Sequence, residues 1–419
     1  MGVAGVVVLL GIALLLSRDR RRALSPRIFA WGLGLQLAIG LFALRTSAGA
    51  RLFAWSNDAA NHFIGFANAG IRFVFGDWPA VAIVQAPGLG PEQGALRTVT
   101  VGFVLAVKVL PIIVFIASLM AVLYHLGIMQ RVVALLARGL SRSMRISGAE
   151  ALSTVGDVFM GMTEAPLLIR PYIARMTESE LFAVMCAGMA TISGSVLLAY
   201  VAMGVDAGYL VTASFMSAPA AVMIAKIMVP ETGVPETSNA AQVAVPRLDV
   251  NVIDAAARGA SEGLQLALNV GAMLIAFVAL VAMADKGASV VGGLFGHPEL
   301  TLGRILGTPL APLAYVMGVP WGEAPFVGEL IGTKTVLNEF IAYQAMTSHL
   351  DLLSPKSVRI ASFALCGFAN FGSLAIVLGG IGGMAPERRG DLARLGVRSI
   401  VAGTLATCLS ATIAGLVGG

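Results

Sequence analysis

Cys186 to Ser195 reads C-A-G-M-A-T-I-S-G-S, and Cys366 to Ser373 repeats this word as C-G-F-A-N-F-G-S. With a slip of two residues, both copies hold a cysteine, a glycine, a bulky apolar residue, an alanine, Thr or Asn, and Gly-Ser. Each word interrupts an apolar stretch. Backbone can leave a helix at membrane depth only where protein or a water-filled cavity covers it, so the interruptions indicate a site.

The surroundings of the two words also repeat. An acidic residue in an apolar stretch precedes each copy, in G-M-T-E-A-P (Gly161 to Pro166) and in V-L-N-E-F (Val336 to Phe340). Short amphipathic stretches at 127–145 and 299–319 come before these. Small-residue words alone are also common where membrane helices pack closely. Paired interruptions in two halves of a chain are instead typical of a secondary transporter with inverted repeats and a site at mid-membrane.

The composition excludes a soluble protein. Of the 419 residues, 57% are hydrophobic and 12% are charged, against about 25% charged in ordinary soluble domains. At about 20 residues per span, the length allows about eight transmembrane helices. The net charge of +5 is explained by cytoplasmic loops and does not indicate nucleic acid. Three cysteines in apolar stretches and four scattered histidines indicate neither disulfides nor a metal centre, and no signal indicates an organic cofactor.

The N-terminal part predicts a scaffold. The apolar run Val3 to Leu16 precedes a basic cluster at 18–27, so we expect a retained helix whose N-terminus lies outside the cell. Ile28 to Leu44 returns through the membrane. The stretch Arg51 to Trp78 is amphipathic and predicts an interfacial helix. A Pro- and Gly-rich loop, Ala86 to Gly94, and a long apolar helix, Val99 to Leu123, follow.

We therefore predict an all-α polytopic membrane protein with three regions. The N-terminal helices, interfacial helix and scaffold occupy residues 1–125. The first repeat occupies 126–230, with a re-entrant hairpin at 147–175 and an interrupted helix at 180–203. The second repeat occupies 250–419, with a re-entrant hairpin at 322–347 and an interrupted helix at 357–382.

Carboxylates within these apolar stretches are the candidate functional residues, since an intramembrane acid costs at least about 2.5 kcal/mol. Glu164 and Glu339 each follow a residue that can hydrogen-bond, so each tip suits a ligand rich in N–H and O–H groups. The alternative is a structural ion pair, for instance with Arg170 or Lys334. Asp157 faces the first interruption by the repeat logic and predicts a monovalent cation site. Its alternative is a helix N-cap.

At these residues the chain resembles the concentrative nucleoside transporter family, from about Trp31 to the C-terminus. The resemblance rests on long words in order: G-L-G-L-Q-L (32–37), V-L-P-I-I-V-F (109–115), L-M-A-V-L-Y-H-L-G-I-M-Q (119–130), S-G-A-E (147–150), T-E-A-P-L-L-I-R-P-Y (163–172), S-A-P-A-A (217–221), N-V-I-D-A-A-A-R-G-A-S-E-G (251–263), G-T-K-T-V-L-N-E-F-I-A-Y (332–343) and A-L-C-G-F-A-N-F-G-S (364–373).

The resemblance implies eight transmembrane helices, two re-entrant hairpins, interfacial helices and a homotrimer in the cell (inner) membrane. It places Thr163 and Glu164 at the nucleobase, beside Met162 and with Val196 packing on it. The ribose hydroxyls would be held by four residues of the second repeat: Glu339, Phe368, Asn370 and Ser373. A sodium ion would lie between Asp157, the carbonyl of Met160, Thr191 and the carbonyl of Ile192.

Two residues depart from the family pattern inside that site. Met162 stands where most members have Gln, and Asp157 stands where sodium-coupled members have Asn. We expect a cation-coupled symporter, with sodium favoured because the surrounding hydroxyl and carbonyl set is retained. Its substrates would be nucleosides such as uridine, cytidine or adenosine. The alternative is proton coupling through Asp157, with nucleosides or related ribosides as substrates. A channel or a membrane enzyme is disfavoured, because no nucleophile–base or metal-ligand motif occurs.

Overall fold

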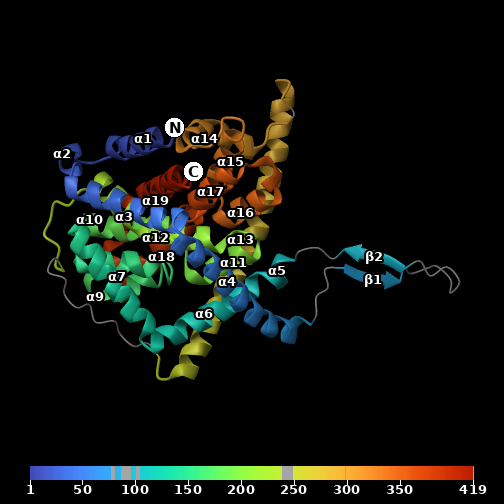
Figure 1. Ribbon diagram of the computed structural model, residues 1–419, viewed down its shortest axis with the longest axis horizontal. Helices are drawn as coiled ribbons and strands as arrows, with labels where there is room; N and C mark the ends of the chain where they lie inside the picture. Colours follow the sequence, from blue (N-terminus) through green and yellow to red (C-terminus); the bar gives the residue numbers. More distant parts are fainter. Residues whose placement is uncertain (77–80, 86–95, 101–103, 238–248, 298, 419) are drawn as a thin grey trace.

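The computed structural model describes residues 1–418 except 77–80, 86–95, 101–103, 238–248 and 298. Over these residues the chain forms a helical body from which one β-hairpin projects (Figure 1). Six helices in the described part are long and apolar enough to cross a membrane: Pro26–Arg45, Leu105–His125, Glu178–Ala202, Ala207–Met228, Val252–Leu294 and Pro386–Val417. Two shorter apolar helices are Gly2–Leu15 and Phe371–Met384. The predicted all-α polytopic fold is confirmed, and the number of eight spans stays a prediction.

The N-terminal region begins beside the C-terminal end of the chain (Figure 1). Gly2 lies so close to Leu416 that an added Cβ would be 2.6 Å from its Cδ2. The helices of this region are α1 (Gly2–Leu15), α2 (Arg20–Ala23), α3 (Pro26–Arg45), α4 (Ser47–Phe75), α5 (Leu105–Lys108) and α6 (Leu110–His125). The amphipathic stretch predicted at 51–78 lies largely in α4, and Trp78 is outside the described residues.

The β-hairpin is an element that the sequence interpretation did not contain. Strand β1 (Val81–Gln85) pairs antiparallel with β2 (Leu96–Thr100), with Val81 opposite Thr100. The prediction of a helix from Val99 is therefore wrong at its start, since helix α5 begins at Leu105. Thr98, Val99 and Thr100 are β-branched residues, which favour strands over helices. The loop predicted at 86–94 lies outside the described residues.

Helix α6 packs along the long helix α13 (Val252–Leu294). Two glycines four residues apart allow this approach, as in small-xxx-small pairs of membrane helices. A Cβ added at Gly259 would lie 2.6 Å from the Ala117 carbonyl oxygen. A Cβ added at Gly263 would lie 2.8 Å from the Ala117 Cβ. The two helices therefore form one wall of the protein, and residues of both line a cavity together with residues of the first hairpin.

The two halves contain the same order of elements. The first half has α7 (Ile128–Met144), α8 (Gly148–Asp157), η1 (Ala165–Ile169), α9 (Arg170–Ile173), α10 (Glu178–Ala190), α11 (Gly194–Ala202) and α12 (Ala207–Met228). The second half has α14 (Leu302–Met317), α15 (Ala324–Val336), α16 (Glu339–Ser348), η2 (Leu350–Leu352), α17 (Pro355–Leu365), α18 (Phe371–Met384), η3 (Pro386–Arg388) and α19 (Arg389–Val417). Each half thus has two helices joined by a polar tip, followed by a helix that breaks within the repeated word.

The two breaks lie against each other in the core. Gly367, in the second break, is so close to α10 that an added Cβ would be 2.9 Å from the Met189 carbonyl oxygen and 3.0 Å from the Ala190 carbonyl carbon. The same Cβ would be 2.8 Å from Thr407 Cγ2 on α19. Only a residue without a side chain fits between these helices, so the repeated glycine is needed where the half-helices cross.

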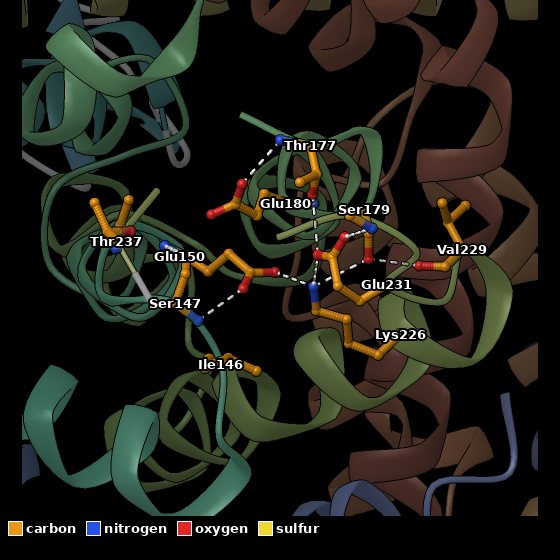
Figure 2. Close-up of polar contacts among 12 residues, drawn as sticks. Ile146, Ser147, Glu150, Thr177, Ser179, Glu180, Lys226, Val229, Glu231 and Thr237 are labelled. Atoms are coloured by element: carbon orange, nitrogen blue, oxygen red, sulfur yellow. Dashed lines mark hydrogen bonds and ion pairs between the residues drawn. The ribbon is translucent and has the colours of Figure 1, made fainter. Parts of the chain in front are cut away.

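The first hairpin begins at a buried ion cluster (Figure 2). Lys226 Nζ, near the end of α12, lies 2.5 Å from Glu150 Oε1 and donates to Glu231 Oε2 at 3.2 Å and to Ser179 Oγ at 3.0 Å. Glu150 also accepts a hydrogen bond from the Ser147 backbone in a capping box, which is the capping role expected from the word S-G-A-E. The cluster ties the starts of α8 and α10 to the end of α12.

Candidate functional site

Asp157 is the last residue of α8, and its carboxylate is buried at the base of the first hairpin. Asp157 is 1% exposed. Neither of its carboxylate oxygens has a hydrogen-bond partner in the described part of the chain. The alternative interpretation as a helix N-cap is wrong, because Asp157 ends its helix. A buried charge without a partner is strongly unfavourable, so this position requires a proton or a cation.

The break of the first interrupted helix lies beside this carboxylate. An added Cβ at Gly188, in the last turn of α10, would be 3.8 Å from Asp157 Oδ1. The backbone N–H of Gly194, where α11 begins, donates to the Phe159 carbonyl at 3.2 Å. Met160 directly follows Phe159, and Ile192 lies two residues before Gly194, so the expected cation residues lie near one junction. Thr191 donates its hydroxyl hydrogen to the Ala187 carbonyl at 2.9 Å, which leaves the hydroxyl oxygen free to accept or to coordinate.

The tip of the first hairpin borders a cavity of about 420 Å³. Glu164 is exposed to it. The lining comes from α6, the start of α7, the first hairpin, α11, and α13 with the segment before it, and includes Tyr124, Met160, Glu164, Ser195 and Arg258. Arg170 also lines the cavity, yet Glu164 forms no ion pair within the described residues, so the structural ion-pair alternative is not supported for this carboxylate.

The same tip reaches the second repeat. Thr163 lies against α18, where an added Cβ at Gly380 would be 3.0 Å from its Cγ2. Met162 lies against α10, where an added Cβ at Gly188 would be 2.8 Å from its Cβ. The hairpin therefore touches an interrupted helix of each repeat through the two residues that precede Glu164.

Glu339 lies at the centre of a buried polar cluster in the second repeat. It is 4% exposed and is the first residue of α16, whose N-cap is Asn338. Tyr200 donates its hydroxyl to Oε1 at 2.8 Å, and Asn370 donates its side-chain amide to Oε2 at 3.0 Å. Asn370 Oδ1 in turn accepts from the Ser373 N–H at 2.7 Å and caps α18. Three candidate residues from one hairpin and one break are thus joined by hydrogen bonds.

The two carboxylates do not open onto the same space. Glu339 does not line the cavity beside Glu164. Phe368, Asn370 and Ser373 are at most 8% exposed, so the ribose half of the predicted site is closed in this structure. Val196, expected to pack on the base, is also buried, at 3% exposed. The structure brings the predicted residues to one region between the two breaks, with the Glu164 side open and the Glu339 side closed.

Two features of this region were not found from the sequence. Tyr200 is completely buried on α11, with its ring 4.8 Å from the rings of Phe340 and Tyr343, and its only signal was a hydroxyl in an apolar half-helix. Arg258, on α13, lines the cavity opposite Glu164.

Arg258 is held by two acids. It donates to Asp249 at 2.6 and 2.9 Å and to both oxygens of Glu262 at 2.9 Å. These hydrogen bonds from the guanidinium hold the pKa of Asp249 below its ordinary value of 3.8. The wall of the cavity therefore carries a satisfied charge network rather than a free cation.

Comparison with known proteins identifies the family. The chain matches the models "Na+ dependent nucleoside transporter N-terminus" over residues 4–78, "Nucleoside recognition" over 106–207 and "Na+ dependent nucleoside transporter C-terminus" over 209–415. It is 42% identical to the nucleoside permease NupC of Helicobacter pylori, over 99% of this chain and 96% of the permease.

Solved structures agree with this match. An inward-facing, substrate-bound structure of CNTnw superposes with a TM-score of 0.89 at 45% identity, covering 100% of this chain and 98% of that one. An outward-facing structure of a CNTnw double variant superposes with a TM-score of 0.90 at 45% identity, over 100% and 98% of the two chains. The relatives are transporters and permeases, not enzymes, and the fold is that of a multi-pass membrane protein, which in bacteria lies in the inner membrane. The chain belongs to the concentrative nucleoside transporter family, whose models describe Na+-dependent transporters of nucleosides.

Proposed function

We propose that this chain is a sodium-coupled symporter that takes up nucleosides by alternating access. The observation that carries the proposal is the buried carboxylate of Asp157, which has no hydrogen-bond partner within the described residues. It lies where the first hairpin meets a break that supplies backbone carbonyls and the hydroxyl of Thr191. Carboxylate, hydroxyl and carbonyl oxygens are hard ligands, and unwound helices supply such ligands to Na+ in transporters.

Sodium is favoured over a proton by the retained oxygen set. A proton on Asp157 would need no further ligands, whereas a sodium ion needs several oxygens at one place. Met160 directly follows Phe159, and Ile192 lies two residues before Gly194, the partner of Phe159 in a backbone hydrogen bond, which supports the role of their carbonyls as ligands. Proton coupling through Asp157 is the alternative that the experiment below separates.

The substrate roles follow the positions of the side chains. Glu164, which lines the open cavity, would bind the base together with Thr163, beside Met162, and Val196 would pack against it. The cluster of Glu339, Asn370 and Ser373, with Phe368 beside it, would bind the ribose hydroxyls. Because this cluster is closed here, ribose binding would require its hydrogen bonds to exchange partners. A carboxylate that accepts from Tyr200 and Asn370 can accept from a ribose hydroxyl in the same way.

Coupling would arise because the ion and the substrate order the same hairpin. A cation between Asp157 and the break would hold the turn after α8 in place, and that turn leads directly to Met162 and Thr163. A fixed tip lowers the cost of binding the nucleoside, and the coupling free energy is reciprocal between ion and substrate. The hairpins and interrupted helices would then move as one unit within a homotrimeric scaffold that includes α4 and α6.

The test is uptake of labelled uridine and adenosine into proteoliposomes. One arm has an inward sodium gradient at equal pH, and the other has an inward proton gradient without sodium. Sodium-driven accumulation is the expected result. Accumulation driven only by protons would keep the transporter and recast Asp157 as a proton carrier, and failure of both nucleosides in both arms would contradict nucleoside transport.

A matched pair of variants tests the sugar site. Glu339→Gln should abolish uptake, because the amide nitrogen presents a donor where Tyr200 or Asn370 also donates. Glu299→Gln, at an exposed position before α14, is the control and should transport like the wild type. Normal uptake by Glu339→Gln would count against the ribose assignment.

A further inference from the structure

Lys334 is completely buried in the protein core without an acidic partner. It lies on α15 and is 0% exposed. Its Nζ donates to the Ala364 carbonyl at 2.8 Å and to Thr407 Oγ1 at 3.0 Å. Both acceptors are neutral, and Lys334 forms no ion pair with any described residue. Neither Glu164 nor Glu339, for which it was a candidate partner, forms an ion pair with it in the described part of the chain, and Glu339 acts on it only as a more distant negative charge. Burying an ammonium ion is strongly unfavourable, so a positive charge at this position depends on these two acceptors and on the helix end beside them.

The end of a half-helix provides that environment. Helix α17 ends at Leu365, where the second repeat breaks. The last carbonyls of a helix have no partner within the helix, and the C-terminal end carries partial negative charge. Lys334 supplies the missing donor at Ala364 and a full positive charge. Thr407 donates its own hydroxyl hydrogen to the Thr404 carbonyl at 3.1 Å, so its oxygen is oriented to accept from the ammonium group.

The first repeat has the opposite charge at the corresponding place. There the first hairpin helix, α8, ends with Asp157, beside the last turn of α10 and its break. In both repeats a residue in the last turn of the hairpin helix reaches the C-terminal end of a half-helix. In the first repeat that residue is a carboxylate without a partner, which needs a cation from solution. In the second repeat it is an ammonium group, which is itself a cation.

We infer that Lys334 is a tethered cation, which holds in the second repeat the place that the coupling cation takes in the first. The comparison with the coupling cation rests on the proposed function, while the ammonium site itself rests only on the contacts of Lys334. Lys334 acts as a positioning residue, since it fixes the last turn of α15 to α17 and α19 and thereby sets the tip that carries Glu339.

The two cation positions are also joined by packing. Thr407, which binds Lys334, touches Gly367 in the second break, and Gly367 touches the carbonyls of Met189 and Ala190 at the end of α10. Thr191 is the next residue after Ala190 in the sequence, and Asp157 lies beside Gly188, which belongs to the same turn of α10 as Ala190. A change in charge at Lys334 or at Asp157 therefore affects the same contact, the one between Gly367 and the end of α10.

The experiment replaces the tethered cation with a free one. Lys334→Ala removes a propylammonium-sized part of the side chain, so n-propylammonium fits the space left, and n-propanol is its neutral counterpart. Thermal unfolding of the purified full chain is measured without nucleoside, with each additive. We expect Lys334→Ala to unfold at a lower temperature than the wild type, and n-propylammonium but not n-propanol to restore most of the difference. Lys286→Ala, exposed on α13, is the control and should respond to neither additive.

Equal restoration by n-propanol would overturn the inference, because packing alone would then explain the site. Lys334→Met keeps the length of the side chain but removes its charge. A thermal unfolding midpoint equal to that of the wild type would also overturn the inference. A midpoint below that of Lys286→Met supports the inference even where Lys334→Ala does not fold.

Equilibrium binding of labelled uridine and adenosine completes the test. The affinity of Lys334→Ala should fall by about tenfold, the size expected for a lost hydrogen bond to a charged group, and recover with n-propylammonium. An unchanged affinity would overturn the positioning role. Failure of the wild type to bind either nucleoside would contradict the proposed function instead, and the unfolding result would still decide on the ammonium site.

Discussion

Replacing Gly367 with alanine should force the two breaks apart. The new methyl group would lie 2.8 Å from Thr407 Cγ2, 2.9 Å from the Met189 carbonyl oxygen and 3.0 Å from the Ala190 carbonyl carbon. Ordinary contacts between carbon atoms are about 3.5–4.0 Å, so the neighbours must withdraw by roughly 0.5–1 Å. Two of the three are backbone atoms of α10 and cannot rotate away. Overpacking of this kind costs about 1–3 kcal/mol of stability.

The assay is thermal or denaturant unfolding of purified protein in mild detergent, followed by tryptophan fluorescence. Gly379→Ala is the matched control, because Gly379 is exposed on α18 and an added Cβ meets no atom within 4 Å. Alanine in a helix is about 0.5–1 kcal/mol more favourable than glycine, so this control should be neutral or stabilising. Equal stability of the two variants would refute the close crossing of the half-helices.

Three further variants test separate contacts. Tyr200→Phe keeps the ring packing but removes the donor to Glu339, so labelled uridine should bind about tenfold more weakly; unchanged binding would count against the cluster. Lys226→Met leaves Glu150 and Glu231 without their buried cation and should lower the free energy of unfolding by about 3–5 kcal/mol. A decrease in this free energy smaller than that of an exposed lysine variant would contradict the prediction. The lowered pKa of Asp249 means that its pairing with Arg258 stabilises the fold fully above pH about 4 and is lost as pH falls through the lowered pKa. Asp249→Asn should therefore show a flatter dependence of unfolding temperature on pH below about 4, and an unchanged profile would exclude this pair.

Much of the site could be predicted because its residues are marked locally. An acid in an apolar stretch and a repeated Gly-Ser word are visible without knowledge of the fold. The resemblance then assigned residue by residue what the pattern left open. The structure places Asp157 beside the first break and joins Glu339 to Asn370 by a hydrogen bond, in keeping with these marks.

The parts that could not be predicted depend on contacts between distant residues. Tyr200 and Glu339 are 139 residues apart, and nothing near Tyr200 indicates an acidic partner. Lys334 could be expected to pair with a carboxylate, since charge alone does not reveal that a helix end would provide its acceptors. The β-hairpin was missed because Val99 and Thr100 extend an apolar run whose hydropathy does not distinguish a strand from a helix.

The central claim is that Asp157 binds the coupling cation, and equilibrium binding of radioactive sodium to purified protein tests it most directly. The wild type should bind sodium, and uridine should raise the affinity for sodium by the same factor by which sodium raises the affinity for uridine. Asp157→Ala should lose sodium binding and the sodium dependence of uridine binding together. Equal sodium binding by the wild type and Asp157→Ala, or uridine binding to the variant that still depends on sodium, would contradict the account.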